Sequence, residues 1–357
     1  MSDRIEVPVA PPYPVVVGAG LDLAEILSGE LEPTVGAIIT DSNVGPLHAA
    51  SLERALEGAG WRVADVVEIP AGETSKSLEA YTKILGRLAR AGMTRNGVLF
   101  ALGGGVVGDL GGFVAATYMR GIALVQLPTS LLAMVDSSVG GKVGVDLPEG
   151  KNLVGGFFQP RAVAADLGWL ETLPDRELSH GLAEVIKMGL LSGGEYFSDL
   201  DKISSARAGD LDALQALILH SVRFKARVVA EDELEKGRRA ILNYGHTIGH
   251  ALEAAAGYAL AHGEAVSVGM VAASLLSRER FGIDLVALHE DVLGSAGLPL
   301  RASNIEVEKA LSAMDRDKKR RAGDEYRFVL LQDVGQPAWG VPVGEGEARR
   351  TIGAIVG

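Results

Sequence analysis

The chain has 357 residues, no cysteine and a formal net charge of −12, so it can form no disulfide, thiolate metal site, iron–sulfur cluster or catalytic thiol. The excess of acidic residues argues against nucleic acid as a partner, because polyanions are bound by clustered cations. An apolar content of 47% is typical of a globular protein, and the length exceeds that of one domain, so we expect two domains.

Neither a secretory leader nor a membrane segment is indicated. The first residues, MSDRIEVPVAPPYP, lack a basic stretch followed by an apolar core, and no run of about 18 uninterrupted apolar residues occurs. We therefore expect a cytoplasmic protein with no membrane partner.

The first half alternates short runs rich in Val, Ile and Leu with segments of helical periodicity. Five runs are typical of buried strands: 13–17, 35–40, 62–69, 97–102 and 122–127. The segments 47–59 and 77–91 are expected to be helices, because each ends near a glycine that can cap it, Gly60 and Gly92. This alternation predicts a mostly parallel sheet.

The second half, from Pro174 onward, is mostly helical. Apolar residues at three- and four-residue spacing predict four helices, at 175–191, 211–231, 238–256 and 264–281. A late segment, 326–331, is expected to be a strand. We thus predict an α/β N-terminal domain over residues 1–170 and a mainly α-helical C-terminal domain over 171–357. The charge run RDKKRR at 316–321, taken by itself, is typical of a solvated loop.

The strongest motif is GGGVVGD at 103–109, which follows a strand and opens a helix. Glycines let the backbone approach an anion, and a helix start offers N–H groups and a positive dipole end to a phosphate. The run satisfies G-x-G-x-x-G, but it follows about the fourth strand, and the next strand offers Gln126 instead of an acidic residue for the ribose. We infer a phosphate-binding loop in a dinucleotide fold other than the Rossmann fold. The alternative is a tight turn that packs a helix on a strand.

Further polar segments follow predicted strands. AGETSK at 71–76 and DSN at 41–43 lie at carboxyl ends of strands, where parallel sheets bind ligands, although each alone is more typical of a turn with a helix N-cap. DSSVGGKVGVD at 136–146 and GKN at 150–152 are glycine-rich and carry lysines, which can contact a phosphate or a carboxylate. The alternative for these two segments is a surface hairpin.

Three of the seven histidines, His246, His250 and His262, fall close together. The first two are four residues apart and share one face of a helix, a familiar spacing of zinc ligands. Thr247 stands where the metalloprotease motif H-E-x-x-H has its glutamate, so that activity is excluded. Glu184 lies in an apolar helical stretch and is a candidate further ligand, because a buried carboxylate needs a cation. The cluster predicts a metal site in the helical domain.

Six cations are candidates for a pocket that binds a small anionic substrate: Lys142, Lys151, Lys187, Lys225, Arg239 and Lys318. Six segments, in this order over nearly the whole chain, resemble motifs of the 3-dehydroquinate synthase family: 103–109, 136–146, 150–160, 181–189, 243–251 and 262–266. The resemblance implies a dehydroquinate synthase-like fold with an NAD-binding domain and a metal- and substrate-binding domain. It also implies a homodimer that uses NAD and Zn²⁺, for which Co²⁺ can substitute.

The activity implied by the resemblance is a lyase reaction of the shikimate pathway of aromatic amino acid biosynthesis, on the way to chorismate. 3-Deoxy-D-arabino-heptulosonate 7-phosphate is converted to 3-dehydroquinate and phosphate. The steps are a transient oxidation by NAD, β-elimination of phosphate, re-reduction, ring opening and aldol closure.

The resemblance also implies the site residues. Zinc is assigned to Glu184, His246 and His262, so that His250 becomes a catalytic hydrogen-bonding residue. NAD is assigned to Asp41, Asn43, Ala71, Gly72, Glu73, Thr74, Ser75, Lys76, Gly105, Val106, Val107, Gly108, Asp109, Thr129, Ser130, Asp136, Lys142, Lys151, Trp169, Leu170, Glu171 and Thr172. The substrate is assigned to Asp136, Lys142, Asn152, Lys187, Lys225, Arg239, Asn243, His250, Arg120 of the neighbouring subunit, and Lys318 or Lys319.

Three alternatives stay open at this stage. A sibling sugar-phosphate cyclase, such as an aminodehydroquinate synthase, is disfavoured by the presence of Lys225, Arg239 and Asn243. A metal-dependent polyol dehydrogenase shares the glycine loop and the two-domain plan, but it releases NADH and needs no cluster of anion-binding lysines. A non-catalytic nucleotide- or metal-binding protein is disfavoured because Lys142 and Glu184 are both present.

Overall fold

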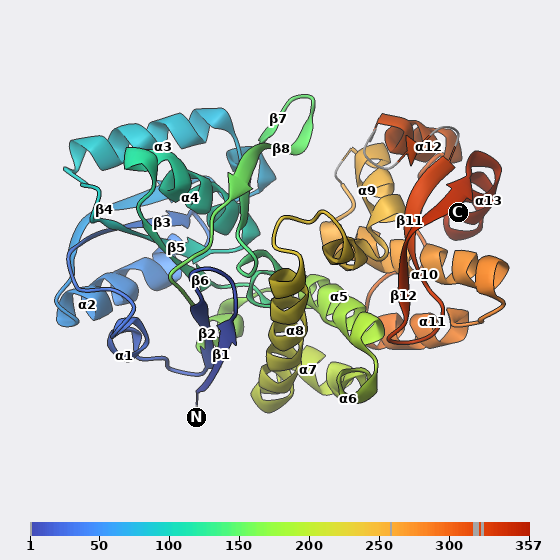
Figure 1. Cartoon of the computed structure of the whole chain (residues 1–357), viewed down its shortest axis with the longest axis horizontal. Helices are drawn as coiled ribbons and strands as arrows, with labels where there is room; N and C mark the ends of the chain where they lie inside the picture. The colour runs from blue at the N-terminus through green and yellow to red at the C-terminus, as the bar shows by residue number, and fades with distance from the viewer. Residues whose placement is uncertain (1, 258, 317–320, 323–324) are drawn as a thin grey trace. The chain divides into compact units, whose positions relative to one another are not determined.

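The computed structural model describes residues 2–257, 259–316, 321–322 and 325–357 (Figure 1). It divides into two compact units. The first unit consists of Met1–Leu173 and Lys225–Leu234, and the second of Pro174–Phe224 and Glu235–Gly357. The structure therefore groups 225–234 with the first unit, whereas the division expected from the sequence places this segment in the second domain.

A seven-stranded sheet, in the order β1-β2-β9-β6-β5-β3-β4, forms the centre of the first unit. Its strands are β1 (Asp3–Val7), β2 (Tyr13–Gly18), β3 (Val35–Asp41), β4 (Arg62–Ile69), β5 (Val98–Gly103), β6 (Ala123–Pro128) and β9 (Ala162–Asp166). β1 pairs with β2 in antiparallel fashion, and the other neighbours are parallel. The mostly parallel sheet is confirmed, and each of the five expected strands is present to within one residue at either end.

Helices cover both faces of this sheet (Figure 1). They are α1 (Leu23–Leu27), α2 (Ala50–Gly58), α3 (Leu78–Arg90) and α4 (Gly105–Thr117). Successive strand residues point to opposite faces: Ile39 packs in one core cluster with Leu110 of α4, and Ile38 packs in another with Leu52 and Leu56 of α2. Because both of their faces are buried, the central strands β3, β5 and β6 consist of largely continuous apolar runs, which is why the sequence revealed them.

The lysine-bearing segments after β6 form a two-stranded hairpin of β7 (Lys142–Leu147) and β8 (Gly150–Phe157). The surface-hairpin alternative is therefore correct as a description of the backbone. At Gly144 a Cβ would lie 2.6 Å from the Val154 carbonyl, so glycine allows the two strands to approach closely.

The second unit is mainly helical, as expected, and includes a small antiparallel sheet. Its helices are α5 (Asp175–Ser192), α6 (Gly194–Ser198), α7 (Ile203–Arg207), the first part of α8 (Leu211–Glu231), α9 (His246–Ala255), α10 (His262–Phe281), α11 (Val286–Ser295), α12 (Val307–Arg316) and α13 (Glu345–Ile355). The sheet contains β10 (Arg321–Ala322), β11 (Glu325–Leu331) and β12 (Pro337–Gly344). No described helix has the length and the apolar sequence that a membrane crossing requires.

The expected single helix over 238–256 is wrong. A 3₁₀ turn, Arg238–Asn243, is followed by Gly245 with φ +78° and only then by α9. A Cβ at Gly245 would lie 2.7 Å from Met270 Cγ, so a side chain is excluded both by the backbone conformation and by α10. The break makes His246 the first residue of its helix.

Candidate functional site

The loops and helix starts at one edge of the parallel sheet carry most of the residues assigned to NAD. β4, β3, β5 and β6 are neighbours in the sheet, so their carboxyl ends meet at this edge. Ser42 N donates to the Ile69 carbonyl at 2.9 Å, and Thr129 N donates to the Gly103 carbonyl at 3.0 Å, which joins the loops in pairs. The assigned residues at this edge are Asp41, Asn43, Ala71, Gly72, Glu73, Thr74, Ser75, Lys76, Gly105, Val106, Val107, Gly108, Asp109, Thr129 and Ser130.

The glycine motif forms the start of α4, with Gly104 as the N-cap residue. Backbone N–H groups in the first turn of a helix have no carbonyl partner within the helix, so they can bind a phosphate. A Cβ at Gly103 would lie 2.6 Å from Val107 Cγ2, and one at Gly108 would lie 2.9 Å from Gln126 Oε1. The motif therefore also allows close packing of the helix on the sheet, so both interpretations of it fit the structure.

Two polar residues at this edge have structural partners. Gln126 is buried, and its Nε2 donates to the Gly108 carbonyl at 3.1 Å, which joins β6 to α4. Asp41 Oδ1 accepts hydrogen bonds from the backbone N of Asn43 at 2.9 Å and of Val44 at 3.0 Å. Asp41 thus caps the turn after β3, the alternative that the sequence left open.

Lys76 is a buried cation that contacts two other elements of the first unit. Its Nζ donates to Asp109 Oδ2 on α4 and to Asn152 Oδ1 on β8, both at 2.5 Å. Burial opposes the charge of this ammonium, but the Asp109 carboxylate outweighs that effect and raises the pKa of Lys76 above its usual value. The structure thus brings together Lys76 and Asp109, assigned to NAD, and Asn152, assigned to the substrate.

Lys225 and Asp136 form a second pair in the first unit. Lys225 Nζ donates to both the carbonyl and Oδ1 of Asp136, each at 2.5 Å, and the lysine is buried. Gln159 Nε2 also donates to Glu233 Oε1 at 2.8 Å. These contacts explain why the segment 225–234 belongs to the first unit.

The other assigned residues of the first unit lie closer to solvent, except Leu170, which is buried. Lys142 is exposed at the start of β7, and Arg120 is exposed with φ +69°. Lys151 Nζ lies 3.8 Å from Glu73 Oε1. The 3₁₀ turn Leu167–Thr172, which follows β9, carries the remaining four: Trp169, Leu170, Glu171 and Thr172.

The structure brings Glu184, His246 and His262 together in the second unit. Glu184 lies on α5 and is fully buried, and the two histidines are the first residues of α9 and α10. His246 Nε2 lies 3.5 Å from Glu184 Oε1, and His262 Nε2 lies 3.6 Å from the same oxygen. One ligand atom from each residue lies within 4.8 Å of the others. Two imidazole nitrogens and one carboxylate are a donor set of catalytic zinc sites, so the group fits such an ion.

The second nitrogen of each imidazole also has a partner. His246 Nδ1 lies 3.0 Å from the Tyr244 carbonyl, and His262 Nδ1 lies 3.4 Å from Glu253 Oε2. Burial lowers the pKa of His262, but its hydrogen bonds to Glu184 and Glu253 outweigh this effect and raise the pKa to about 10. Because a metal ligand must be deprotonated, a metal ion and a proton compete for this imidazole.

His250 is not part of the group formed by Glu184, His246 and His262, although its spacing from His246 was the first indication of a metal site in the sequence. Its side chain is 42% exposed, and its Nε2 lies 4.0 Å from Glu253 Oε2. His250, Glu253 and His262 form a second cluster of close ligand atoms. Sequence reasoning missed Glu253, although it falls on the same face of α9 as His246 and His250, at positions i, i+4 and i+7.

Two further assigned cations of the second unit are almost completely buried. Lys187, on α5, is 1% exposed and contacts the Glu184 carboxylate, and Arg239, in the 3₁₀ turn, is 2% exposed. Asn243 Nδ2 donates to Glu235 Oε1 at 3.0 Å. Lys318 and Lys319 lie outside the described residues.

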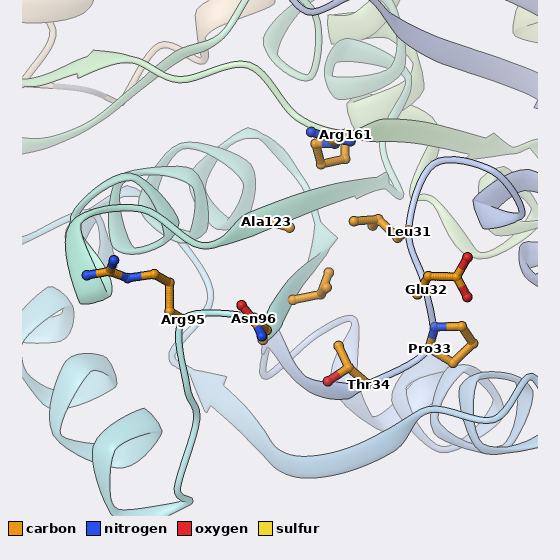
Figure 2. A pocket seen from close by; sticks show the side chains of 10 residues that line it. Leu31, Glu32, Pro33, Thr34, Arg95, Asn96, Ala123 and Arg161 are labelled. Carbon is orange, nitrogen blue, oxygen red and sulfur yellow. The ribbon is translucent and has the colours of Figure 1, made fainter.

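A hollow of about 450 Å³ in the first unit is separate from these residues (Figure 2). It is lined by residues that precede or begin β3, β5, β6 and β9, among them Thr34, Asn96, Ala123 and Arg161. These are the amino ends of the parallel strands, so the hollow lies at the edge opposite the glycine loop.

A parallel α/β unit with a glycine-rich helix start that can bind a phosphate, joined to a helical unit with a His–His–Glu group, is typical of enzymes that use a nucleotide cofactor and a metal ion. Two family descriptions match the chain: 3-dehydroquinate synthase N-terminal over residues 66–180 and 3-dehydroquinate synthase C-terminal over residues 181–320. The chain belongs to the 3-dehydroquinate synthase family.

A relative and two solved structures are similar to this chain. The 3-dehydroquinate synthase of Acidithiobacillus ferrooxidans is 48% identical over 332 residues, which cover 90% of each chain. The structure of 2-deoxy-scyllo-inosose synthase complexed with carbaglucose-6-phosphate, NAD⁺ and Co²⁺ is 29% identical, with a TM-score of 0.89 and 99% of each chain covered. The 2-epi-5-epi-valiolone synthase of Streptomyces hygroscopicus subsp. jinggangensis, with NAD⁺ and Zn²⁺ bound, is 26% identical, with a TM-score of 0.85 and 96% of each chain covered.

Proposed function

We propose that this chain is a 3-dehydroquinate synthase, a carbon–oxygen lyase that converts 3-deoxy-D-arabino-heptulosonate 7-phosphate into 3-dehydroquinate and phosphate. The observation that carries the proposal is the Glu184–His246–His262 group, in a chain that matches both domains of this family. The NAD⁺ and the Co²⁺ or Zn²⁺ in the two similar structures support NAD and one of these metals as cofactors.

The reaction is a transient oxidation of one substrate carbon, β-elimination of phosphate, re-reduction, ring opening and an aldol closure. When bound, NAD⁺ supplies reversible hydride exchange and the metal ion supplies Lewis-acid polarisation of substrate oxygens. Because the hydride returns to the substrate, the overall reaction needs no external oxidant. We propose that the substrate's own phosphate acts as the base and accepts the proton that is removed in the elimination.

In the first unit, the N–H groups at the start of α4 would bind the dinucleotide pyrophosphate. The Lys76–Asp109–Asn152 contacts would fix the loop after β4 beside that helix. Lys142 and Lys225 would bind anionic groups of the substrate as point charges.

In the second unit, Lys187 and Arg239 would bind the substrate's phosphate and carboxylate, while Asn243 and His250 would hydrogen-bond its hydroxyl groups. Both cations belong to or precede elements that carry proposed metal ligands: Lys187 lies on α5 with Glu184, and Arg239 lies in the 3₁₀ turn before α9. Lys318 or Lys319 completes the proposed set.

We extend the proposal to a cytoplasmic homodimer in which the neighbouring subunit contributes Arg120. The resemblance to the family supports the dimer, and the exposure of Arg120 leaves it accessible to a second subunit. Size-exclusion chromatography with light scattering would test the assembly.

The decisive experiment measures phosphate release from 3-deoxy-D-arabino-heptulosonate 7-phosphate by the full chain. NAD is supplied in an amount far below that of the substrate, and the assay is run with and without chelator. We expect many turnovers per NAD, no accumulation of NADH, and loss of activity with chelator. Accumulation of NADH with glycerol, without phosphate release, would establish a polyol dehydrogenase instead. Phosphate release only from glucose 6-phosphate or from an aminated analogue would establish a sibling cyclase.

A further inference from the structure

Glu253 is a buried carboxylate that the proposed reaction does not use. It lies on α9, two turns after His246, and its side chain is 6% exposed. A carboxylate in such a place requires a partner that donates a proton or carries positive charge. The groups facing it include His262 Nδ1, at 3.4 Å from Glu253 Oε2, and His250 Nε2, at 4.0 Å from the same oxygen.

The contact with His262 determines which imidazole nitrogen can bind a metal. An ionised carboxylate only accepts hydrogen bonds, so it favours the tautomer in which Nδ1 of His262 carries the proton. The lone pair then resides on Nε2, which lies 3.6 Å from Glu184 Oε1 and belongs to the proposed metal-binding group. The Glu253 carboxylate thus contacts Nδ1, the ring nitrogen that does not face the other proposed metal ligands.

His246 is oriented in the same way by a different acceptor. Its Nδ1 lies 3.0 Å from the Tyr244 carbonyl, and its Nε2 lies 3.5 Å from Glu184 Oε1. Both imidazoles therefore present Nε2 to the same carboxylate oxygen. The difference is that His246 has a neutral acceptor and His262 an anionic one, whose charge makes the ring more basic.

We propose that Glu253 is a positioning residue of the metal site, which holds the His262 ring and its tautomer so that Nε2 binds the metal. This inference rests on the proposed metal site at Glu184, His246 and His262. It differs from a role of Glu253 as a direct ligand in the cluster with His250 and His262, and from a purely structural role in α9.

The test is a titration of the metal-free full chain with Co²⁺, followed by its visible absorption bands, together with Zn²⁺ affinity from competition with a chelator. We expect Glu253→Ala to weaken binding by roughly 10- to 100-fold, as the loss of such partners does elsewhere. Glu253→Gln keeps a carbonyl oxygen that can accept the Nδ1 hydrogen, so we expect it to recover most of the affinity and to shift the Co²⁺ bands only slightly. Glu290→Gln, which removes an exposed acidic group on α11, is the charge-matched control and should bind as the unmodified chain does.

A Zn²⁺ affinity of Glu253→Ala equal to that of the unmodified chain would overturn the proposal. An equal loss of Zn²⁺ affinity in the Ala and Gln variants would also overturn it, because it would indicate that Glu253 is a direct ligand. Thermal unfolding of each metal-free variant shows whether the fold is intact. If the Ala variant does not fold, a loss of Zn²⁺ affinity of roughly 10-fold or more in Glu253→Gln would also overturn the proposal, because the amide oxygen can still accept the Nδ1 hydrogen. Failure of the unmodified chain to bind Co²⁺ would instead contradict the proposed metal site itself.

Discussion

Lys187 follows Glu184 by one helical turn on α5, and its ammonium contacts the Glu184 carboxylate where both side chains are buried. The carboxylate that would bind the metal ion therefore also faces a buried cation of its own helix. Removing one member of a buried ion pair typically costs about 3–5 kcal/mol, because the other charge stays buried without it.

Lys187→Met should therefore destabilise the metal-free chain by roughly 3 kcal/mol. Zn²⁺ should restore much of this loss, because the ion supplies positive charge to Glu184, so the metal-dependent gain in stability should be larger than in the unmodified chain. Urea unfolding with and without Zn²⁺ measures both quantities. The matched control is Lys309→Met, which removes an exposed lysine from its pair with Glu306 at the same spacing and should cost less than about 1 kcal/mol.

Glu184→Ala should abolish binding of one equivalent of Zn²⁺ and, with it, phosphate release. The reason is that Glu184 supplies the one carboxylate of the proposed ligand group. The measurements are the metal content after dialysis and the Co²⁺ absorption. The control is Glu177→Gln, which changes a half-exposed acidic residue in the first turn of the same helix. Full retention of metal in the Ala variant would remove Glu184 from the site.

The strands at the centre of the sheet could be predicted because burial on both faces gives continuous apolar runs. β9 escaped prediction since its sequence, AVAAD, is rich in alanine, which has little strand propensity. β1, DRIEV, alternates polar and apolar residues, and its exposed positions made it inconspicuous.

The metal group illustrates what periodicity can and cannot predict. Spacing along one helix indicated His246 with His250, whereas the structure places His246 with residues of α5 and α10. That arrangement depends on close packing of α9 on α10, where a Cβ at Gly249 would lie 3.0 Å from the Ala265 carbonyl. Such contacts between helices leave no mark in local spacing. The residues alone offered Glu184 and all three histidines, and only the resemblance to a family removed His250 from the ligands.

Lys142→Ala should reduce phosphate release by about 100-fold or more and leave the fold intact. Lys142 is exposed on β7, and surface substitutions usually change stability by less than about 0.5 kcal/mol. Steady-state kinetics and thermal unfolding separate the two effects. Lys83→Ala, at an exposed position of α3, is the control and should affect neither. Unchanged kinetics in the Lys142 variant would remove this lysine from the proposed substrate site.

His289 should make the second unit less stable at acid pH. Tyr244 Oη lies 2.8 Å from His289 Nε2, and His289 Nδ1 lies 2.7 Å from the Leu285 carbonyl, so the neutral ring donates from Nδ1 and accepts at Nε2. Burial lowers the pKa of His289 to about 4, well below the value of about 6.5 in an unfolded chain. Below pH 6.5 the unfolded chain therefore binds a proton that the folded chain does not, and this lowers the free energy of unfolding as the pH falls toward 4.

Between pH 7.5 and pH 5 this one group should lower the free energy of unfolding by roughly 2 kcal/mol. The measurement is urea unfolding of the metal-free protein at both pH values, for the unmodified chain and for His289→Leu. The variant should be less stable at pH 7.5, because it leaves the Tyr244 hydroxyl without this acceptor, but its stability should fall less on acidification. If the free energy of unfolding fell equally in both proteins between pH 7.5 and pH 5, His289 would already be protonated in the folded state, or the acid sensitivity would arise from other groups.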